Sequence, residues 1–272
     1  MNIRTLLSFG SGTVRMAGMI LLFFAIQFGC IRVASLFGGD TSFIELPPSV
    51  SAFWLLVSSV LTVAFFGLFS WVRPIDLHWG YWSWKGYACA VTWMLSAILP
   101  VNFLTEAMQL DNTLEQQFLA WMRTPWGVLN IVLAAPLAEE VVFRAGLLGT
   151  MLRSGCSGGG AMVFSALLFA VFHGNPAQIP VAFLLGLMLG YLYLHSRSLW
   201  PGWFAHAANN LIGVLTAWRA EDDVSVSLTD MLGGPWPTAA VLSLSLLLFV
   251  VIFFCIRRFY SVSRNNAFDR IN

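Results

Sequence analysis

Charged side chains are scarce in this sequence. Only 10% of its 272 residues are Asp, Glu, Lys or Arg, whereas 58% are hydrophobic. A soluble domain carries roughly 25% charged residues, so the charged side chains here are too few to cover a surface exposed to water. The net charge of +1 provides no field that would attract a polyanion. These shortages exclude an ordinary cytosolic enzyme, a disordered chain and a protein that binds nucleic acid.

Cysteine is also scarce, with four residues and no CxxC pair. Cys30, Cys89 and Cys255 lie in apolar stretches, and Cys156 lies in a glycine-rich loop. This spacing matches neither a disulfide framework nor a cysteine-based metal site. We therefore expect no structural disulfide and no redox function from these residues.

Long apolar stretches are abundant instead. Uncharged runs cover residues 46–72, 86–105, 154–196, 198–218 and 231–256. A membrane-spanning helix needs about 20 apolar residues, so the longest of these runs is sufficient for two helices, with Pro176 near the break. Two more apolar stretches carry charges, near residues 16–37 and near residues 126–152.

These stretches predict eight membrane-spanning helices in a single membrane domain of residues 1–272. Helices are expected because lipid offers no hydrogen-bond partners to unpaired backbone groups. The predicted fold class is therefore all-α, a polytopic membrane protein with an eight-helix transmembrane bundle. The expected spans are residues 14–37, 53–72, 86–105, 125–152, 160–174, 176–194, 199–217 and 238–259.

Basic residues orient the predicted bundle, because they collect at the cytoplasmic ends of membrane helices. One set of span ends carries Arg4, Arg15, Arg73, Lys85, Arg153, Arg197, Arg257, Arg258, Arg264 and Arg270. The opposite ends carry Asp40, Glu45, Glu106, Asp111, Glu115, Glu221, Asp222, Asp223 and Asp230, together with Arg123 and Arg219. This alternation predicts a multi-pass protein with both termini in the cytoplasm. The short loops and compact ends further favour the inner membrane of a bacterium.

Two connecting segments have an amphipathic or aromatic pattern. Residues 78–84 form an aromatic cluster on the predicted cytoplasmic side, which is typical of a membrane interface. In residues 111–122, one helical face carries Leu114, Phe118, Trp121 and Met122. This pattern predicts an amphipathic helix that is anchored on the outer surface, with a lid as the alternative.

The fourth expected span contains three charged residues, and ionisable groups inside a membrane indicate function by default. Glu140 and Arg144 are four residues apart, so on an α-helix they share a face and can form an ion pair. Glu139 is rotated from its neighbour by about 100° and has no charged partner three or four residues away. Glu139 is therefore the carboxylate that is left available for chemistry.

Polar residues also occur in two later spans. His173 ends the fifth expected span, and His206 and Asn210 share a face in the seventh. A buried His can simply satisfy hydrogen bonds, and Asn often links membrane helices. Together with Glu139, however, these residues supply what the hydrolysis of a peptide by activated water requires. A base takes a proton from water, and donors stabilise the developing oxyanion.

These residues form three motifs, which are Glu139-Glu140-x-x-x-Arg144 (EExxxR), Phe169-x-x-x-His173 (FxxxH) and His206-x-x-x-Asn210 (HxxxN). In this order, on separate predicted membrane helices, they resemble the CPBP family, also called the Abi or CAAX type II protease family. That family includes the eukaryotic Ras-converting CAAX protease. The resemblance covers about residues 125–217, which we interpret as the catalytic core.

The resemblance implies an eight-helix intramembrane glutamic endopeptidase, which is a hydrolase. Carried over to this sequence, it implies that Glu139 and His173 activate water, while His206 and Asn210 form the oxyanion hole. The ion pair predicted next to Glu139 would hold the site together. The expected partners are the lipid bilayer and a membrane-anchored protein or peptide substrate. Candidate cleavage sites are a CAAX-like C-terminus, a leader peptide or a C-terminal membrane anchor.

Three alternatives remain open at this point. Two His and a Glu could bind zinc with one open position, although the chain has no HExxH motif and Asn is an unusual zinc ligand. We expect no cofactor, with zinc as the alternative. A non-proteolytic scaffold or regulator of a partner such as a sensor kinase would not need Glu139. A transporter or channel is disfavoured, because no internal repeat is recognisable.

Overall fold

The computed structural model describes residues 3–79, 83–219 and 227–268. Every regular element in these ranges is a helix, which agrees with the predicted all-α class. Five of the described helices are long and apolar enough to cross a membrane, as expected of a multi-pass membrane protein. They are α1 (Ile3–Phe37), α2 (Pro48–Leu68), α4 (Trp84–Met108), α10 (Gln178–Ser196) and α13 (Pro235–Phe268).

The other three predicted spans are helical, but they do not meet the same criteria of length and apolar composition. α9 (Gly158–Val171) has only 14 residues, and α11 (Trp200–Arg219) carries His206 and two Asn residues. The predicted span 125–152, which holds three charges, is divided into α6 (Pro125–Leu129), η1 (Asn130–Ala134), α7 (Ala135–Glu139), η2 (Glu140–Leu148) and α8 (Gly149–Arg153). The structure therefore supports a membrane bundle but does not confirm the count of eight spans.

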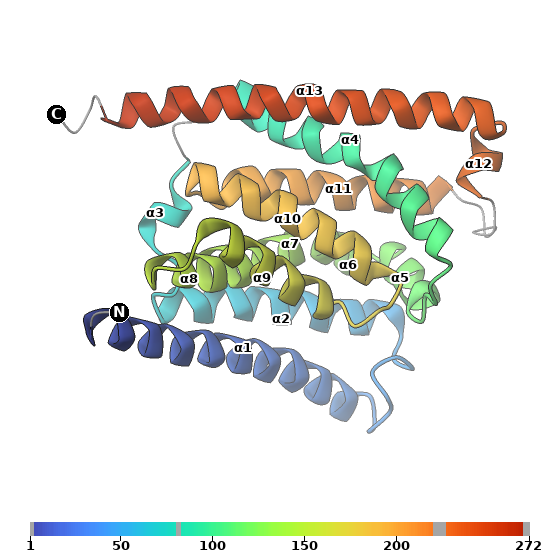
Figure 1. Cartoon of the computed structure of the whole chain (residues 1–272). Coiled ribbons are helices and arrows are strands. Elements are labelled where there is room, and N and C mark those ends of the chain that lie inside the picture. Colours follow the sequence, from blue (N-terminus) through green and yellow to red (C-terminus); the bar gives the residue numbers. More distant parts are fainter. Residues whose placement is uncertain (1–2, 80–82, 220–226, 269–272) are drawn as a thin grey trace.

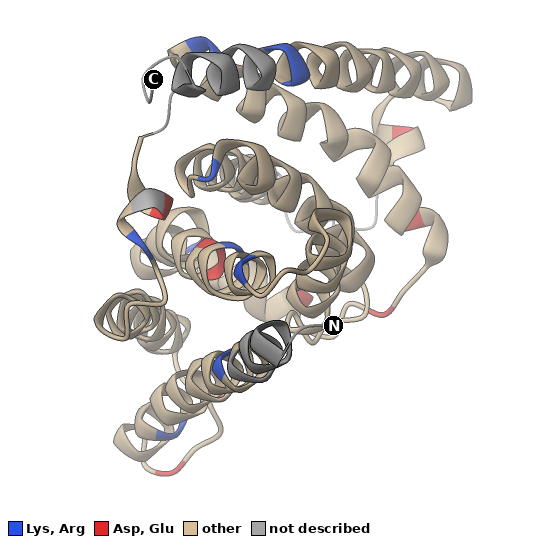
Figure 2. Cartoon of the chain, turned by 60° about the vertical axis from the view of Figure 1, so that its left-hand side comes forward, with Lys and Arg blue, Asp and Glu red and all other residues tan. Residues whose placement is uncertain are grey.

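The helices form a bundle with the divided helix α6–α8 inside it (Figure 1). α1 lies at one edge against α2, and α13 lies at the opposite edge against α4. α4 also packs against α11, and α10 packs against α9. Figure 2 shows how few charged positions interrupt the lengths of these helices. The interior segment is thus enclosed by apolar elements on both flanks.

The two described chain ends lie at the same end of the bundle as α3 (Pro74–Leu77) and α8 (Figure 1). α5 (Glu115–Met122) and α12 (Leu228–Met231) lie at the opposite end. The alternation of span ends that the charges predict is thus compatible with the arrangement of the helices. Glu221, Asp222 and Asp223 of that prediction lie outside the described residues.

The segment that follows α2 is tied to the turn between α10 and α11. The carboxylate of Asp76 is buried; it accepts from the Tyr193 hydroxyl at 2.7 Å and from the Arg73 backbone N–H at 2.8 Å. The backbone oxygen of Asp76 accepts from Leu199 N at 2.8 Å. These bonds fix the start of α11, the helix that carries His206.

The predicted aromatic cluster at residues 78–84 contributes to the same junction. Trp79 stacks on Trp200 with ring centroids 4.5 Å apart. Residues 80–82 of the cluster lie outside the described ranges. The described part of this segment therefore packs on α11, and its place at a membrane interface stays a prediction.

The predicted amphipathic helix is present as α5. Its Trp121 is buried and donates from Nε1 to the Ser51 hydroxyl in α2 at 2.8 Å. The apolar face of α5 thus packs on the bundle, and Phe118 belongs to the same packed cluster. The helix covers one end of the interior segment.

We expect Asp76→Ala to destabilise the protein by about 1–3 kcal/mol, because it leaves the buried Tyr193 hydroxyl without its acceptor. Thermal unfolding in detergent measures this loss. Adding Tyr193→Phe to Asp76→Ala should recover part of it, since the stranded hydroxyl is removed. Asp111→Ala, at an exposed position, is the control. Equal unfolding temperatures for Asp76→Ala and Asp111→Ala would contradict the assigned role.

Candidate active site

The divided helix departs from regular α-helical geometry in two places. η1 and η2 are π-helical, so their backbone bonds connect residues five apart. In η1 the Ala135 N–H donates to Asn130 O, and the same register pairs Ile131 with Pro136, which has no N–H. The regular α-helix assumed for this span in the sequence analysis is therefore wrong, and Pro136 helps to explain why.

The altered register leaves backbone carbonyls that accept bonds from neighbouring helices. Ile131 O accepts from Asn210 Nδ2 at 2.9 Å, and Leu133 O accepts from Trp203 Nε1 at 3.1 Å. In η2, Phe143 O accepts from the Ser165 hydroxyl at 2.7 Å. Buried carbonyls of this kind require partners. Here the partners fix the position of the divided helix against α9 and α11.

A buried ion pair lies at the start of η2. Glu140 and Arg144 are both fully buried, and Arg144 Nε lies 3.4 Å from Glu140 Oε2. Arg144 also donates from Nη2 to Gly186 O in α10 at 3.2 Å, and its guanidinium lies 4.5 Å from the centroid of the Phe169 ring. The contact between the two charged groups thus agrees with the pairing expected from their spacing. It is also linked to α9 and α10.

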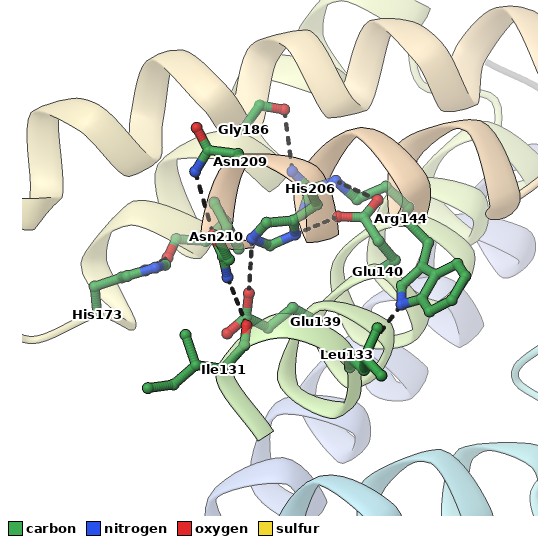
Figure 3. Close-up of polar contacts among 12 residues, drawn as sticks. Ile131, Leu133, Glu139, Glu140, Arg144, His173, Gly186, His206, Asn209 and Asn210 are labelled. Atoms are coloured by element: carbon green, nitrogen blue, oxygen red, sulfur yellow. Dashed lines mark hydrogen bonds and ion pairs between the residues drawn. The ribbon is translucent and has the colours of Figure 1, made fainter. Parts of the chain in front are cut away.

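His206 joins this pair to Glu139 (Figure 3). Its Nδ1 lies 3.4 Å from Glu140 Oε1, and its Nε2 lies 3.6 Å from Glu139 Oε2. A protonated imidazole has a donor on each nitrogen and can serve both carboxylates. His206 is 4% exposed, whereas the Glu139 side chain keeps 26% of its surface exposed. The two adjacent glutamates therefore have different environments.

The exposed part of Glu139 faces a cavity of about 610 Å³ inside the bundle. The polar side of this cavity is formed by Glu139, His173, His206, Asn209 and Asn210. The other lining residues are mostly aromatic and apolar, with a few further polar side chains, and they come from α1, α2, α5, the divided helix, α9, α10 and α11. All four residues that the sequence analysis assigned to catalysis thus line one cavity, although they come from three separate helical segments.

His173 lies just beyond α9 and lines the same cavity as Glu139. Its Nδ1 lies 2.8 Å from Phe169 O. Because a carbonyl oxygen only accepts, Nδ1 is the donor in this contact, and in a neutral ring Nε2 keeps its lone pair. The arrangement prepares Nε2 to accept a proton.

The side chain of Asn210 connects α11 to η1. Besides donating to Ile131 O, it accepts from Asn209 Nδ2 at 3.2 Å. Asn209 lines the cavity but was not among the predicted site residues. Its position next to Asn210 in an apolar helix was the available signal. One Nδ2 hydrogen of Asn210 remains for a group in the cavity.

Gly202 is a site residue for which the sequence contains no signal. A Cβ at this position would lie 2.9 Å from Glu140 Oε2. α11 can therefore approach the buried ion pair closely only because residue 202 has no side chain. Phe169 was noted for its motif, but its contact with the Arg144 guanidinium depends on the fold.

Metal ligation was left open by the sequence. In residues 3–79, 83–219 and 227–268, no group of three or more His, Cys, Asp and Glu side chains is arranged to hold a metal ion. In this geometry His206 directs both ring nitrogens at carboxylates.

Comparison with known proteins agrees with the motifs. A family model described as type II CAAX prenyl endopeptidase Rce1-like matches residues 121–212. No curated protein and no solved structure matches the chain. The resemblance to the CPBP (Abi, CAAX type II protease) family is confirmed over the matched segment, which contains all three motifs. This similarity supports a CAAX-type membrane protease, and therefore a peptidase.

We expect Gly202→Ala to destabilise the protein by about 1–3 kcal/mol, because overpacking displaces the buried Glu140 carboxylate. Gly213→Ala in the same helix is the matched control, since a Cβ there meets nothing within 4 Å. That change should be neutral or should stabilise by about 0.4–1 kcal/mol. Thermal unfolding in detergent distinguishes the two variants. Equal stability would show that the close approach of α11 is unimportant.

Proposed function

We propose that this chain is an intramembrane glutamic endopeptidase that cleaves a membrane-associated protein or peptide with activated water. The observation that carries the proposal is that Glu139, His173, His206 and Asn210 line one cavity within the bundle. The match of residues 121–212 to a CAAX protease family supports the same reaction class. Residues 125–217 would form the catalytic core of a single membrane domain.

In this proposal Glu139 and His173 activate the attacking water. Glu139 suits the role because its carboxylate is partly exposed to the cavity, whereas the Glu140 side chain is 1% exposed. The Nε2 lone pair of His173 provides a second acceptor in the same cavity. Two acceptors orient the water, and a carboxylate takes its proton as the oxygen attacks the peptide carbonyl carbon.

The attack places negative charge on the former carbonyl oxygen. Asn210 can donate its remaining Nδ2 hydrogen to this oxyanion, and a protonated His206 can donate an N–H that now faces Glu139. Collapse of the intermediate breaks the C–N bond and restores the carbonyl. The proton taken from water passes to the leaving amine nitrogen, so protons balance over the cycle.

The proposed setting is an eight-span bundle in a bacterial inner membrane with both termini in the cytoplasm. The buried site requires a substrate that reaches the interior of the bilayer. Three such substrates fit: a CAAX-like C-terminus, a leader peptide or a C-terminal anchor. We propose that no metal or other cofactor takes part, because a carboxylate base and a set of hydrogen-bond donors already supply the required chemistry.

We expect Glu139→Gln to reduce cleavage by about 10²–10⁴-fold, because the amide cannot accept the proton from water. The assay compares the termini of membrane proteins in native cells that carry the wild-type chain or the variant at equal expression. Fragments that disappear with Glu139→Gln identify the substrate and the cleaved bond.

The exposed Glu45→Gln is the matched control for this comparison and should leave the fragments unchanged. Both variants should unfold at the wild-type temperature. If Glu139→Gln produces every wild-type fragment, the proposed base is wrong. If no fragment depends on the wild-type chain and either version rescues the cellular phenotype, a scaffold or regulator is the better assignment.

Hydrolysis of the identified substrate by the purified protein should be unaffected by a strong zinc chelator. A zinc endopeptidase that cuts a reference peptide serves as the positive control for chelation. Activity that is lost with the chelator and returns on addition of zinc would contradict the metal-free mechanism.

A further inference from the structure

One face of α1 forms part of the wall of the cavity that holds the candidate catalytic residues. Phe23, Phe24, Gln27, Phe28 and Ile31 all line the cavity. Their spacing of three and four residues places them on a single helical stripe. This stripe is apolar except for Gln27, whose Oε1 accepts from the Ser58 hydroxyl of α2 at 3.0 Å. The wall therefore presents an aromatic surface directly to the candidate active site.

Aromatic rings close the space between α1 and α9 at this level. Phe24 stacks on Phe172 with ring centroids 4.7 Å apart, and Phe23 meets the same ring edge-on at 5.6 Å. Along its length α1 packs closely against α2, η2 and α8. We name the contacts of Phe23 and Phe24 with Phe172, together with Phe28, which stacks on Phe24, the α1–α9 seam. It depends on side chains that rotate, rather than on closely packed backbones.

The seam is also thin. Phe24 and Phe28 line the cavity, yet they are 38% and 62% exposed. A residue that lines a cavity and is still largely uncovered belongs to a wall that is one side chain thick. On the opposite flank, by contrast, α10 and α11 are covered by α4, which is followed by α13 (Figure 1). The site is therefore covered more thinly on the α1 side than on the side of α4 and α13.

The depth of the seam determines what meets it from outside. The apolar stretch of α1 runs from Gly12 to Phe37, and Phe24 lies at its middle. A position at the middle of a membrane-spanning stretch faces hydrocarbon rather than water. A group that reaches Phe24 from outside the bundle therefore comes from within the bilayer.

From this geometry we propose that the α1–α9 seam is the lateral route by which an apolar, bilayer-embedded segment of the substrate reaches Glu139. The aromatic stripe of α1 then binds the apolar side chains of that segment beside the cleaved bond. The proposal rests on the proposed function and specifies its substrate as a protein segment dissolved in the membrane. The continuity of the aromatic surface from the seam into the cavity is the supporting observation.

The test is a reversible lock of the seam. Phe24→Cys and Phe172→Cys are combined in a full-length chain whose four native cysteines are replaced by Ala, and the pair is joined by oxidation or a short bis-maleimide. Phe37→Cys with Trp54→Cys is the matched control. That ring pair, at 6.1 Å, ties α1 to α2 and does not line the cavity.

The probe is the membrane protein whose fragment is lost with Glu139→Gln. Joining residues 24 and 172 should reduce its cleavage in vesicles at least tenfold, and a reductant should restore cleavage after oxidation. The control lock should leave cleavage within twofold of the unlocked chain. A short water-soluble peptide that spans the same cleaved bond reports whether the catalytic groups survive the lock. Undiminished cleavage of the embedded substrate by the locked chain would overturn the proposal that the substrate enters through the seam.

A second measurement decides the case in which the lock stops cleavage of both the peptide and the embedded substrate. A benzophenone side chain replaces Phe28 in the Glu139→Gln chain, and illumination should link it covalently to the embedded substrate. The same group at Leu244 of α13, which is 67% exposed, is the control and should give no adduct. Absence of the adduct at position 28 overturns the route. A wild-type chain that cuts no membrane protein overturns the proposed function itself.

Discussion

The charge of Arg144 is the constraint around which the interior of this protein is arranged. Its side chain is the largest of the fully buried ones in the described ranges, and a buried charge is costly unless it is paired and hydrogen-bonded. Glu140, from the same segment, forms the ion pair with Arg144. The Gly186 carbonyl of α10 accepts a hydrogen bond from the guanidinium, and the Phe169 ring of α9 lies against it. The divided helix, α9 and α10 are thus held together around one buried guanidinium.

Neutralisation also explains why two adjacent glutamates differ. Glu140 lies between Arg144 and His206 and balances buried positive charge. Glu139, one residue earlier, meets the same imidazole from the cavity side. The charges of Glu140 and Arg144 cancel, and His206 of α11 has one ring nitrogen near each of the two carboxylates. Glu140 thus serves the stability of the interior, while Glu139 is left available for chemistry.

The sequence predicts much of this site, because charges in apolar helices are few and their spacing is informative. The all-helical class, the Glu140–Arg144 contact and the family resemblance follow from residues alone. The π-helical register does not, since an apolar segment has the same pattern in either register, although Pro136 was a local indication. Gly202 and the α1–α9 seam depend on which helices become neighbours, which composition does not reveal. The three predicted spans that do not meet the criteria of length and apolar composition are the ones that carry the polar groups.

The length of α9 has a consequence for the backbone that follows it. At about 1.5 Å per residue, its 14 residues extend about 21 Å, whereas the hydrocarbon core of a bilayer is about 30 Å thick. Phe172, just past the end of α9, stacks on Phe24 at the middle of the apolar stretch of α1. The non-helical turn that contains His173 therefore lies at membrane depth, where irregular backbone is tolerated only when it is buried in protein or lines a water-filled cavity. Since His173 lines the cavity, this turn can find its missing hydrogen-bond partners in water held there.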